Sequence, residues 1–102
     1  FTDYGFVNQS QVCVSSASSP QAGQTHRSSN NFTVSTTGSY KVSGLPSTSA
    51  IAQVWHAVPA GADQLLAAIS NGTSVQLQAG TSYYIGSPAN FNGMSANICF
   101  NS

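Results

Sequence analysis

Apolar and polar residues alternate along most of this chain, in short runs that end at turn residues. In residues 31–35, NFTVS, the apolar positions are Phe32 and Val34, and their neighbours are polar. A period of two is typical of strands with one buried face, and a helical period of 3.6 is nearly absent. We expect this run to form a hairpin with residues 39–45. The complete pattern predicts strands at residues 5–16, 31–35, 39–45, 50–58, 64–69, 73–78, 81–87 and 95–101.

Residues 64–69, QLLAAI, are the one ambiguous run. Leucine, alanine and glutamine favour helix, but six residues make a poor isolated helix. The pair Asn71-Gly72 follows, and Asn-Gly is the strongest short-range hairpin signal. We therefore predict a strand that forms a hairpin with residues 73–78.

About eight or nine short strands with frequent turns predict an antiparallel β-sandwich or jelly roll. The 102 residues are enough for one domain, so we expect a single sandwich over residues 1–102. Residues 15–30 are almost entirely polar and predict a long loop or part of an edge strand.

The two cysteines stand in the first and the last predicted strand. Cys13 lies in the sequence VCV and Cys99 in ICF, so if their apolar neighbours face the core, both thiols face outward. Neighbouring strands bring such side chains to disulfide distance. Closing a loop of roughly 86 residues would stabilise the fold by about 4–5 kcal/mol in the chain-entropy model. We expect this disulfide rather than two buried thiols, and with it a secreted protein.

Charge is almost missing from the chain. Charged residues make up 4% of the total and the formal net charge is zero, whereas about a quarter of a typical domain is charged. Two cations do not support nucleic-acid or anionic-membrane binding, and no apolar run is long enough for membrane insertion. A surface of hydroxyl and amide groups instead suits contact with copies of the chain, polysaccharide or covalent glycans. The opening FTDYGF is unlike a signal peptide, so we expect a mature chain.

No constellation of residues predicts catalysis or metal binding. The carboxylates Asp3 and Asp63 stand near the start of the chain and in a turn, so they do not predict a glycosidase pair. Triads are recognised by geometry, and nothing in the sequence orients His26 in its polar stretch or His56 in its strand. Two imidazoles fall short of a zinc site, which leaves a metal shared between subunits as the alternative. We expect no enzyme activity, no cofactor and no metal.

Trp55, Tyr83 and Tyr84 are candidates for a flat ligand platform that would stack against sugar rings. Tyr83 and Tyr84 are adjacent, so in a strand they point to opposite faces and we expect one to be exposed. Asparagine and glutamine side chains would add hydrogen bonds to sugar hydroxyls. The alternative for Trp55 is core packing.

Three Asn-x-Ser/Thr sequons predict acceptor sites for N-linked glycans, provided that the host glycosylates and the site is exposed. The acceptor residues are Asn8, Asn31 and Asn71. We expect Asn71, in its tight turn, to be the most accessible.

The segments FTVSTTGSYKVSG, VQLQAGTSYYIGS and FNGMSANICF follow the element order of a bacterial pre-peptidase C-terminal domain. The chain resembles this family of small extracellular jelly-roll sandwiches over roughly two thirds of its length, chiefly in residues 32–42 and 79–85. The resemblance implies the sandwich fold and an accessory or adhesive role beside a larger protein. The family's acidic residues, which often hold calcium, have no counterparts here, so metal binding does not carry over.

Together these observations predict a non-catalytic, secreted structural or adhesive subunit of an extracellular assembly, such as a filament, a pilus-like fibre or a surface layer. Its opening segment, residues 1–8, either adds as a strand to the sheet edge of a neighbouring copy or forms the first strand of its own domain. The alternatives are a carbohydrate-binding module, an accessory domain of a secreted enzyme, and a small secreted toxin or effector. The apolar residues of the possible joining segment are Phe1, Tyr4, Phe6 and Val7.

Overall fold

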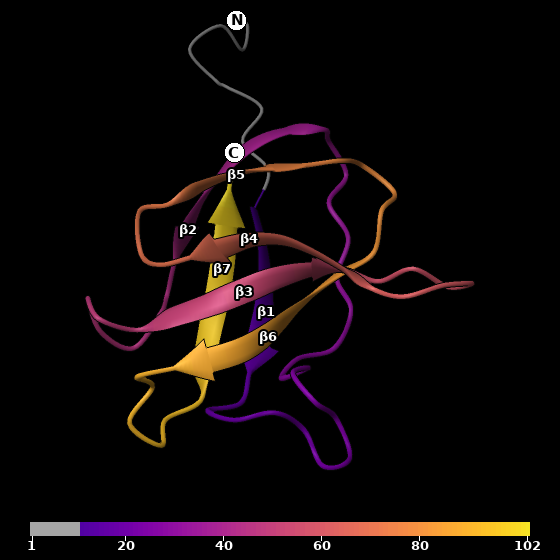
Figure 1. Cartoon of the computed structure of the whole chain (residues 1–102). Coiled ribbons are helices and arrows are strands. Elements are labelled where there is room, and N and C mark those ends of the chain that lie inside the picture. The colour runs from indigo at the N-terminus through magenta and orange to yellow at the C-terminus, as the bar shows by residue number, and fades with distance from the viewer. Residues whose placement is uncertain (1–10) are drawn as a thin grey trace, which may run out of the picture.

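The computed structural model of the chain describes residues 11–102, which form seven β-strands and no helix (Figure 1). All strand pairs are antiparallel. Within this described part, no helix is long and apolar enough to cross a membrane. The strands are β1 (Gln11–Ser16), β2 (Gly38–Ser43), β3 (Ile51–His56), β4 (Gln64–Ile69), β5 (Ser74–Leu77), β6 (Tyr83–Ala89) and β7 (Ala96–Asn101).

The strands build two sheets around one core. The first sheet has the order β1-β7-β2-β5 and the second the order β4-β3-β6. In Figure 1 the strands of the second sheet run across those of the first. Val42 and Phe100 of the first sheet and Val54 and Ile85 of the second share one buried cluster, each at most 1% exposed. The predicted all-β fold is confirmed, with seven strands in residues 11–102 where about eight or nine were expected for the whole chain.

The predicted hairpin around Asn71-Gly72 is wrong, although both of its strands exist. β4 belongs to the second sheet and β5 to the first. The turn between them is held by β2, because Gly72 N–H donates to the Val42 carbonyl and Val42 N–H donates to the Thr73 carbonyl, each at 2.8 Å. The Asn71 side chain adds two hydrogen bonds to the backbone of Leu45. These contacts direct the chain from one sheet into the other.

The predicted hairpin of residues 31–35 with 39–45 is also wrong. Phe32 exchanges two backbone hydrogen bonds with Tyr83 of β6, at 2.7 and 2.9 Å. Residues 31–35 therefore reach the free side of β6 in the second sheet and do not pair with β2. The apolar alternation itself was read correctly, since Phe32 and Val34 are buried.

The long polar stretch, residues 15–30, connects the two sheets through buried serines. The hydroxyls of Ser16 and Ser28 lie 2.9 Å apart. The Ser28 hydroxyl donates to the Ile85 carbonyl at 3.1 Å, and the Ser29 hydroxyl accepts from the Ile85 N–H at 2.7 Å. Buried backbone groups need such partners, so serine is a structural requirement at these positions.

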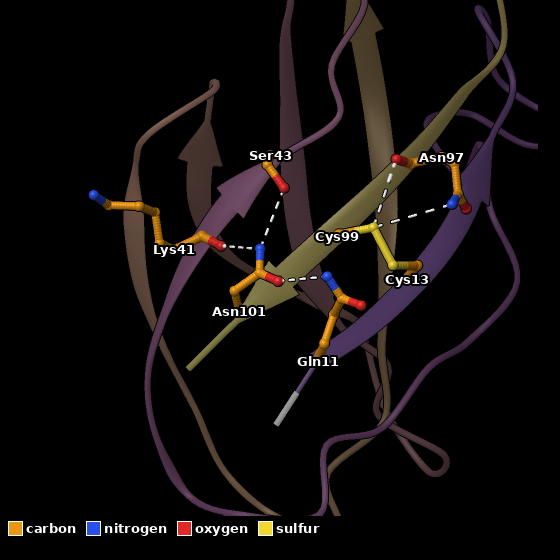
Figure 2. The surroundings of a disulfide bond; sticks show 7 residues. All are labelled: Gln11, Cys13, Lys41, Ser43, Asn97, Cys99 and Asn101. Atoms are coloured by element: carbon orange, nitrogen blue, oxygen red, sulfur yellow. Dashed lines mark hydrogen bonds between the residues drawn. A yellow bond between two sulfur atoms is a disulfide. The ribbon is translucent and has the colours of Figure 1, made fainter. Parts of the chain in front are cut away.

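The disulfide joins Cys13 of β1 to Cys99 of β7 at directly opposite positions, with the Cα atoms 4.0 Å apart (Figure 2). Cys13 is exposed and Cys99 partly exposed, so the bond lies on the outer face of the first sheet, as predicted. Beside it, the Asn101 side chain accepts a hydrogen bond from Gln11 and donates to the Lys41 carbonyl. The last strand is thus tied to both of its neighbours, and a disulfide of this kind is typical of oxidising compartments.

Candidate functional site

Two regions of the second sheet stand out within residues 11–102. The first is a cluster around Tyr84 on the outer face. Trp55 and Tyr84 lie opposite each other in β3 and β6, with ring centroids 6.4 Å apart and planes 3° from parallel. The loop before β2 adds His26, which stacks on Trp55 at 3.9 Å, and Arg27, whose guanidinium lies 3.8 Å from the centroid of the Tyr84 ring. Both stacking and cation–π contact stabilise this arrangement.

Gly86 allows the loop to approach so closely. A Cβ atom there would lie 2.9 Å from the His26 carbonyl oxygen and 3.0 Å from Trp55 Cδ1. The His26 carbonyl accepts the Ser87 N–H at 2.8 Å, and Arg27 forms a β-bridge with Gly86. The loop therefore docks against β6 through backbone as well as side-chain contacts.

Four side chains of the Tyr84 cluster form one chain of hydrogen bonds. Asp63, just before β4, accepts from the Tyr84 hydroxyl at 2.7 Å and from the Val58 N–H at 2.9 Å. Because the single hydroxyl hydrogen of Tyr84 goes to Asp63, the 2.6 Å contact between Tyr84 and His26 Nε2 requires a hydrogen on Nε2. His26 Nδ1 lies 3.1 Å from the Thr25 hydroxyl. The cluster thus fixes the orientation of the imidazole.

The same contacts shift the pKa values of two groups. The hydrogen bond from Tyr84, followed by that from the Val58 N–H, lowers the pKa of Asp63. Burial, together with the Asp63 carboxylate, raises the pKa of Tyr84 to about 12. The lowered pKa of Asp63 stabilises the fold above the ordinary value of 3.8, and this contribution is lost as the pH falls through the folded-state pKa.

The predicted sugar platform is wrong in its two tyrosines. We expected one of them to be exposed, but Tyr83 is 4% and Tyr84 1% exposed. Tyr83 belongs to the core cluster, and Tyr84 faces outward beneath Arg27. Trp55 alone stays partly exposed.

The expectation that nothing orients the histidines is also wrong for His26. Tyr84 and Trp55 hold its ring, as described above. Within residues 11–102, no group of three or more His, Cys, Asp or Glu side chains is placed to hold a metal ion. The Tyr84 hydroxyl bonds to Asp63 and His26, and these bonds fasten the loop to the sheet.

The second region is the free edge of β4, the outermost strand of the second sheet. β4 pairs with β3 and has no strand partner on its other side within residues 11–102. Charged side chains and proline usually protect an edge strand from pairing with another chain. The sequence of β4, QLLAAI, contains neither. The edge strands β1 and β5 expose mainly polar side chains. β4 instead exposes Leu65 at 53% and Leu66 at 44%.

A β-bulge contributes to this exposure. Val54 of β3 lies opposite Ala67, but the next residue, Trp55, lies opposite Leu65. Leu66 is therefore an extra residue on β4, and such a bulge breaks the alternation of inward and outward side chains. The two bulkiest side chains at the start of β4 lie outside the core as a result.

A hollow of about 290 Å³ opens beside this edge, between the start of β4 and the end of β5. Leu65 and Leu66 line it from β4, Gln76 and Gln78 from the β5 side, and Tyr83 from β6. His56, Gln64 and Thr81 complete the lining, so the two leucines lie among polar side chains. Another hollow, of about 230 Å³, lies beside the start of β1, where no large apolar side chain is exposed.

The structure places two of the three sequons. Asn71 was expected to be the most accessible, but its side-chain nitrogen and oxygen both bond to the Leu45 backbone. Asn31 is exposed and uses only its oxygen, which accepts from Arg27 at 2.8 Å. Asn71 is exposed as well, so the two acceptors differ in that the Asn71 side-chain nitrogen already donates to the Leu45 carbonyl. Asn8, like Phe1, Tyr4, Phe6 and Val7 of the predicted joining segment, lies outside the described residues.

The resemblance of residues 32–42 and 79–85 to the pre-peptidase C-terminal family stays a prediction. No family model, no curated protein and no solved structure matches the chain.

Proposed function

We propose that this chain is a non-catalytic structural subunit that associates with copies of itself in an extracellular assembly, such as a filament or a surface layer. The observation that carries the proposal is the free edge of β4, which is uncharged and exposes Leu65 and Leu66. A sheet edge of this kind is a template for pairing with another chain. A subunit that stays monomeric would be expected to protect it with lysine, proline or a covering loop.

The distribution of charge supports self-association. The formal net charge is zero, so copies do not repel each other at long range. Arg27 and Asp63 are both engaged by Tyr84. Lys41, the remaining formal charge within residues 11–102, lies on β2 in the first sheet. β4 itself carries no charged side chain, so a second copy that pairs with its edge meets no charge on that strand.

Negative-stain electron microscopy beside sedimentation velocity tests the proposal on the purified full chain. We expect regular filaments or sheets together with species much larger than the 10.5 kDa monomer. A single monomeric species at all concentrations would refute the proposal.

Glycan binding is a second candidate because Trp55 stays partly exposed on the outer face of the second sheet, opposite Leu65. We expect Trp55→Ala to lower retention on polysaccharide columns. Ile51→Ala is the matched control, since Ile51 lies on the same strand and is 46% exposed. Unchanged retention of Trp55→Ala, with the fold verified by circular dichroism, would end this candidate.

A further inference from the structure

We infer that Asn92 is a site of spontaneous covalent modification, at which the side-chain amide is lost and an aspartate or isoaspartate takes its place. The inference goes beyond the proposed function and does not depend on it. It is carried by the exposure of Asn92 and Gly93, by the few hydrogen bonds around them, and by the contrast with Asn71-Gly72, the other Asn-Gly pair of the chain.

An asparagine that is followed by glycine can react with its own backbone, because glycine has no side chain to hinder its nitrogen. The Gly93 amide nitrogen loses its proton to hydroxide and attacks the side-chain carbonyl carbon of Asn92. The bond from this carbon to Nδ2 breaks, and Nδ2 takes a proton back from water and leaves as ammonia. Water then opens the resulting succinimide ring at either carbonyl, which yields aspartate or isoaspartate. Water is consumed and ammonia released, with no change of oxidation state.

Asn92 and Gly93 are the central residues of a tight turn between β6 and β7, at the lower left of Figure 1. Both have a positive φ, 55° for Asn92 and 75° for Gly93, as in a type I′ turn. The Met94 N–H closes the turn by donating to the Phe91 carbonyl at 3.0 Å. Asn92, Gly93 and Met94 are all exposed, so water and hydroxide reach the reacting atoms.

Little else holds the reacting groups of this turn. Within residues 11–102, the Asn92 side chain and the Gly93 N–H have no hydrogen-bond partner. A Cβ atom at Gly93 would meet nothing within 4 Å apart from the adjacent residues. The rotation that brings the Asn92 side chain to the Gly93 nitrogen therefore costs no more than the hydrogen bond between Met94 and Phe91. Exposed turns of this kind open at low free energy.

Asn71-Gly72 is also exposed, but its reacting groups are held. The Asn71 side-chain oxygen accepts from the Leu45 N–H at 2.9 Å, and its nitrogen donates to the Leu45 carbonyl at 3.2 Å. The attacking nitrogen is engaged as well, because the Gly72 N–H donates to the Val42 carbonyl at 2.8 Å. These hydrogen bonds must open before a ring can form. Asn71-Gly72 is therefore the protected pair and Asn92-Gly93 the reactive one.

The modification changes the electrostatics of a nearly uncharged molecule. The unmodified chain has a formal net charge of zero, with two cations and two anions, and an isoelectric point of about 6.9. Either product adds a carboxylate, so each modified copy becomes an anion and its isoelectric point falls. Isoaspartate also leads the backbone through the former side chain, which lengthens the turn between Phe91 and Met94.

Incubation of the purified full chain at mildly alkaline pH tests the inference, followed by chymotryptic peptide mapping with tandem mass spectrometry. Each modified peptide gains the mass difference between a hydroxyl and an amino group. Because every hydrogen bond that must open lowers the reactive population, we expect Asn92 to react at least about tenfold faster than Asn71. The rate at Asn92 should rise in proportion to the hydroxide concentration, and the isoelectric point should fall as Asn92 is lost.

The reduced chain, unfolded in guanidinium chloride, is the internal control. Both Asn-Gly pairs lose their native contacts there, so Asn71 and Asn92 should react at similar rates. A difference that persisted in the unfolded chain would come from neighbouring residues in the sequence, and it would overturn the structural argument.

Asn92→Gln and Asn92→Asp are the matched variants. Glutamine would have to close a larger ring, so Asn92→Gln should keep its isoelectric point throughout the incubation. Asn92→Asp carries the charge of the product from the start and should focus with the modified wild type. Both variants leave Asn71 unchanged, and circular dichroism verifies their fold.

The outcomes are independent of the proposed function, because the rates at Asn92 and Asn71 do not require assembly. A native chain in which Asn92 stays intact while the unfolded chain reacts would overturn the inference. Equal rates at Asn92 and Asn71 in the native chain would overturn it as well.

Discussion

Tyr84 brings together three side chains that can carry charge in a chain where charged residues are scarce. Arg27 lies over its ring, and His26 and Asp63 bond to its hydroxyl. Arg27 and His26 come from the loop before β2 and Asp63 from the segment before β4, whereas Tyr84 itself belongs to β6. A single phenol therefore connects three segments that are far apart in the sequence.

We expect Tyr84→Phe to change how stability depends on pH. The folded-state pKa of about 12 lies above the ordinary value of 10.0. The neutral phenol therefore makes its full contribution to the stability of the fold at pH values below the ordinary pKa. This stability is lost as the pH rises through the folded-state pKa. Over this interval the free energy of unfolding should fall more steeply for the wild type than for Tyr84→Phe, as measured by urea unfolding at a series of pH values. Parallel profiles would contradict the raised pKa.

The Tyr84 cluster could not be predicted from the sequence, although Trp55, Tyr84, His26 and Asp63 were each considered separately. Alternation correctly placed Tyr83 and Tyr84 on opposite faces, but exposure depends on what covers the outer face. The cover comes from residues 15–30, whose polar composition predicts only a loop or part of an edge strand. The scarcity of charge was the one available signal, because it makes Arg27 and Asp63 conspicuous.

At the scale of elements, the turn between β4 and β5 decides which sheet each strand joins. Asn71 bonds to the backbone N–H and carbonyl of Leu45, at 2.9 and 3.2 Å. We expect Asn71→Ala to lower the free energy of unfolding by about 1–3 kcal/mol, because two backbone groups lose their partner. The measurement is the midpoint of urea unfolding. Asn30→Ala is the matched control, since Asn30 is exposed and its backbone carbonyl takes part in the hydrogen bond from Ser29.

An unchanged midpoint for Asn71→Ala would mean that other contacts hold this turn. Those contacts would be the backbone hydrogen bonds that Val42 makes with Gly72 and Thr73.

Strand positions were largely predictable, and strand partners were not. The period of two in residues 73–78 depends on which face is buried, and this is a local property of the strand. Residues 64–69 have no such period and were predicted from their length and from the Asn-Gly pair that follows. An Asn-Gly pair predicts that the chain reverses, but the partners of this turn are Leu45 and Val42, which are distant in the sequence. The free edge of β4 was missed for the same reason, since the predicted hairpin would have paired it with β5.

At the scale of the whole molecule, association should be insensitive to salt. Neither β4 nor the walls of the hollow carry a formally charged residue, and about 1 M salt shortens the Debye length to about 3 Å. We expect the sedimentation profile of the wild type to be unchanged, or shifted to larger species, as sodium chloride is raised. Dissociation at high salt would indicate that ion pairs hold the subunits together.

The position of the disulfide determines how the domain responds to mechanical load. A pull on Gln11 and Ser102 passes through the bridge between Cys13 and Cys99 and two short tails, while the second sheet lies inside the closed loop and carries no tension. While the disulfide is intact, a pull can therefore extend only the short tails outside the bridge. Reduction would release the 86-residue separation, about 280–310 Å of extended chain. Between Gln11 and Ser102, the bridge therefore makes the domain nearly inextensible.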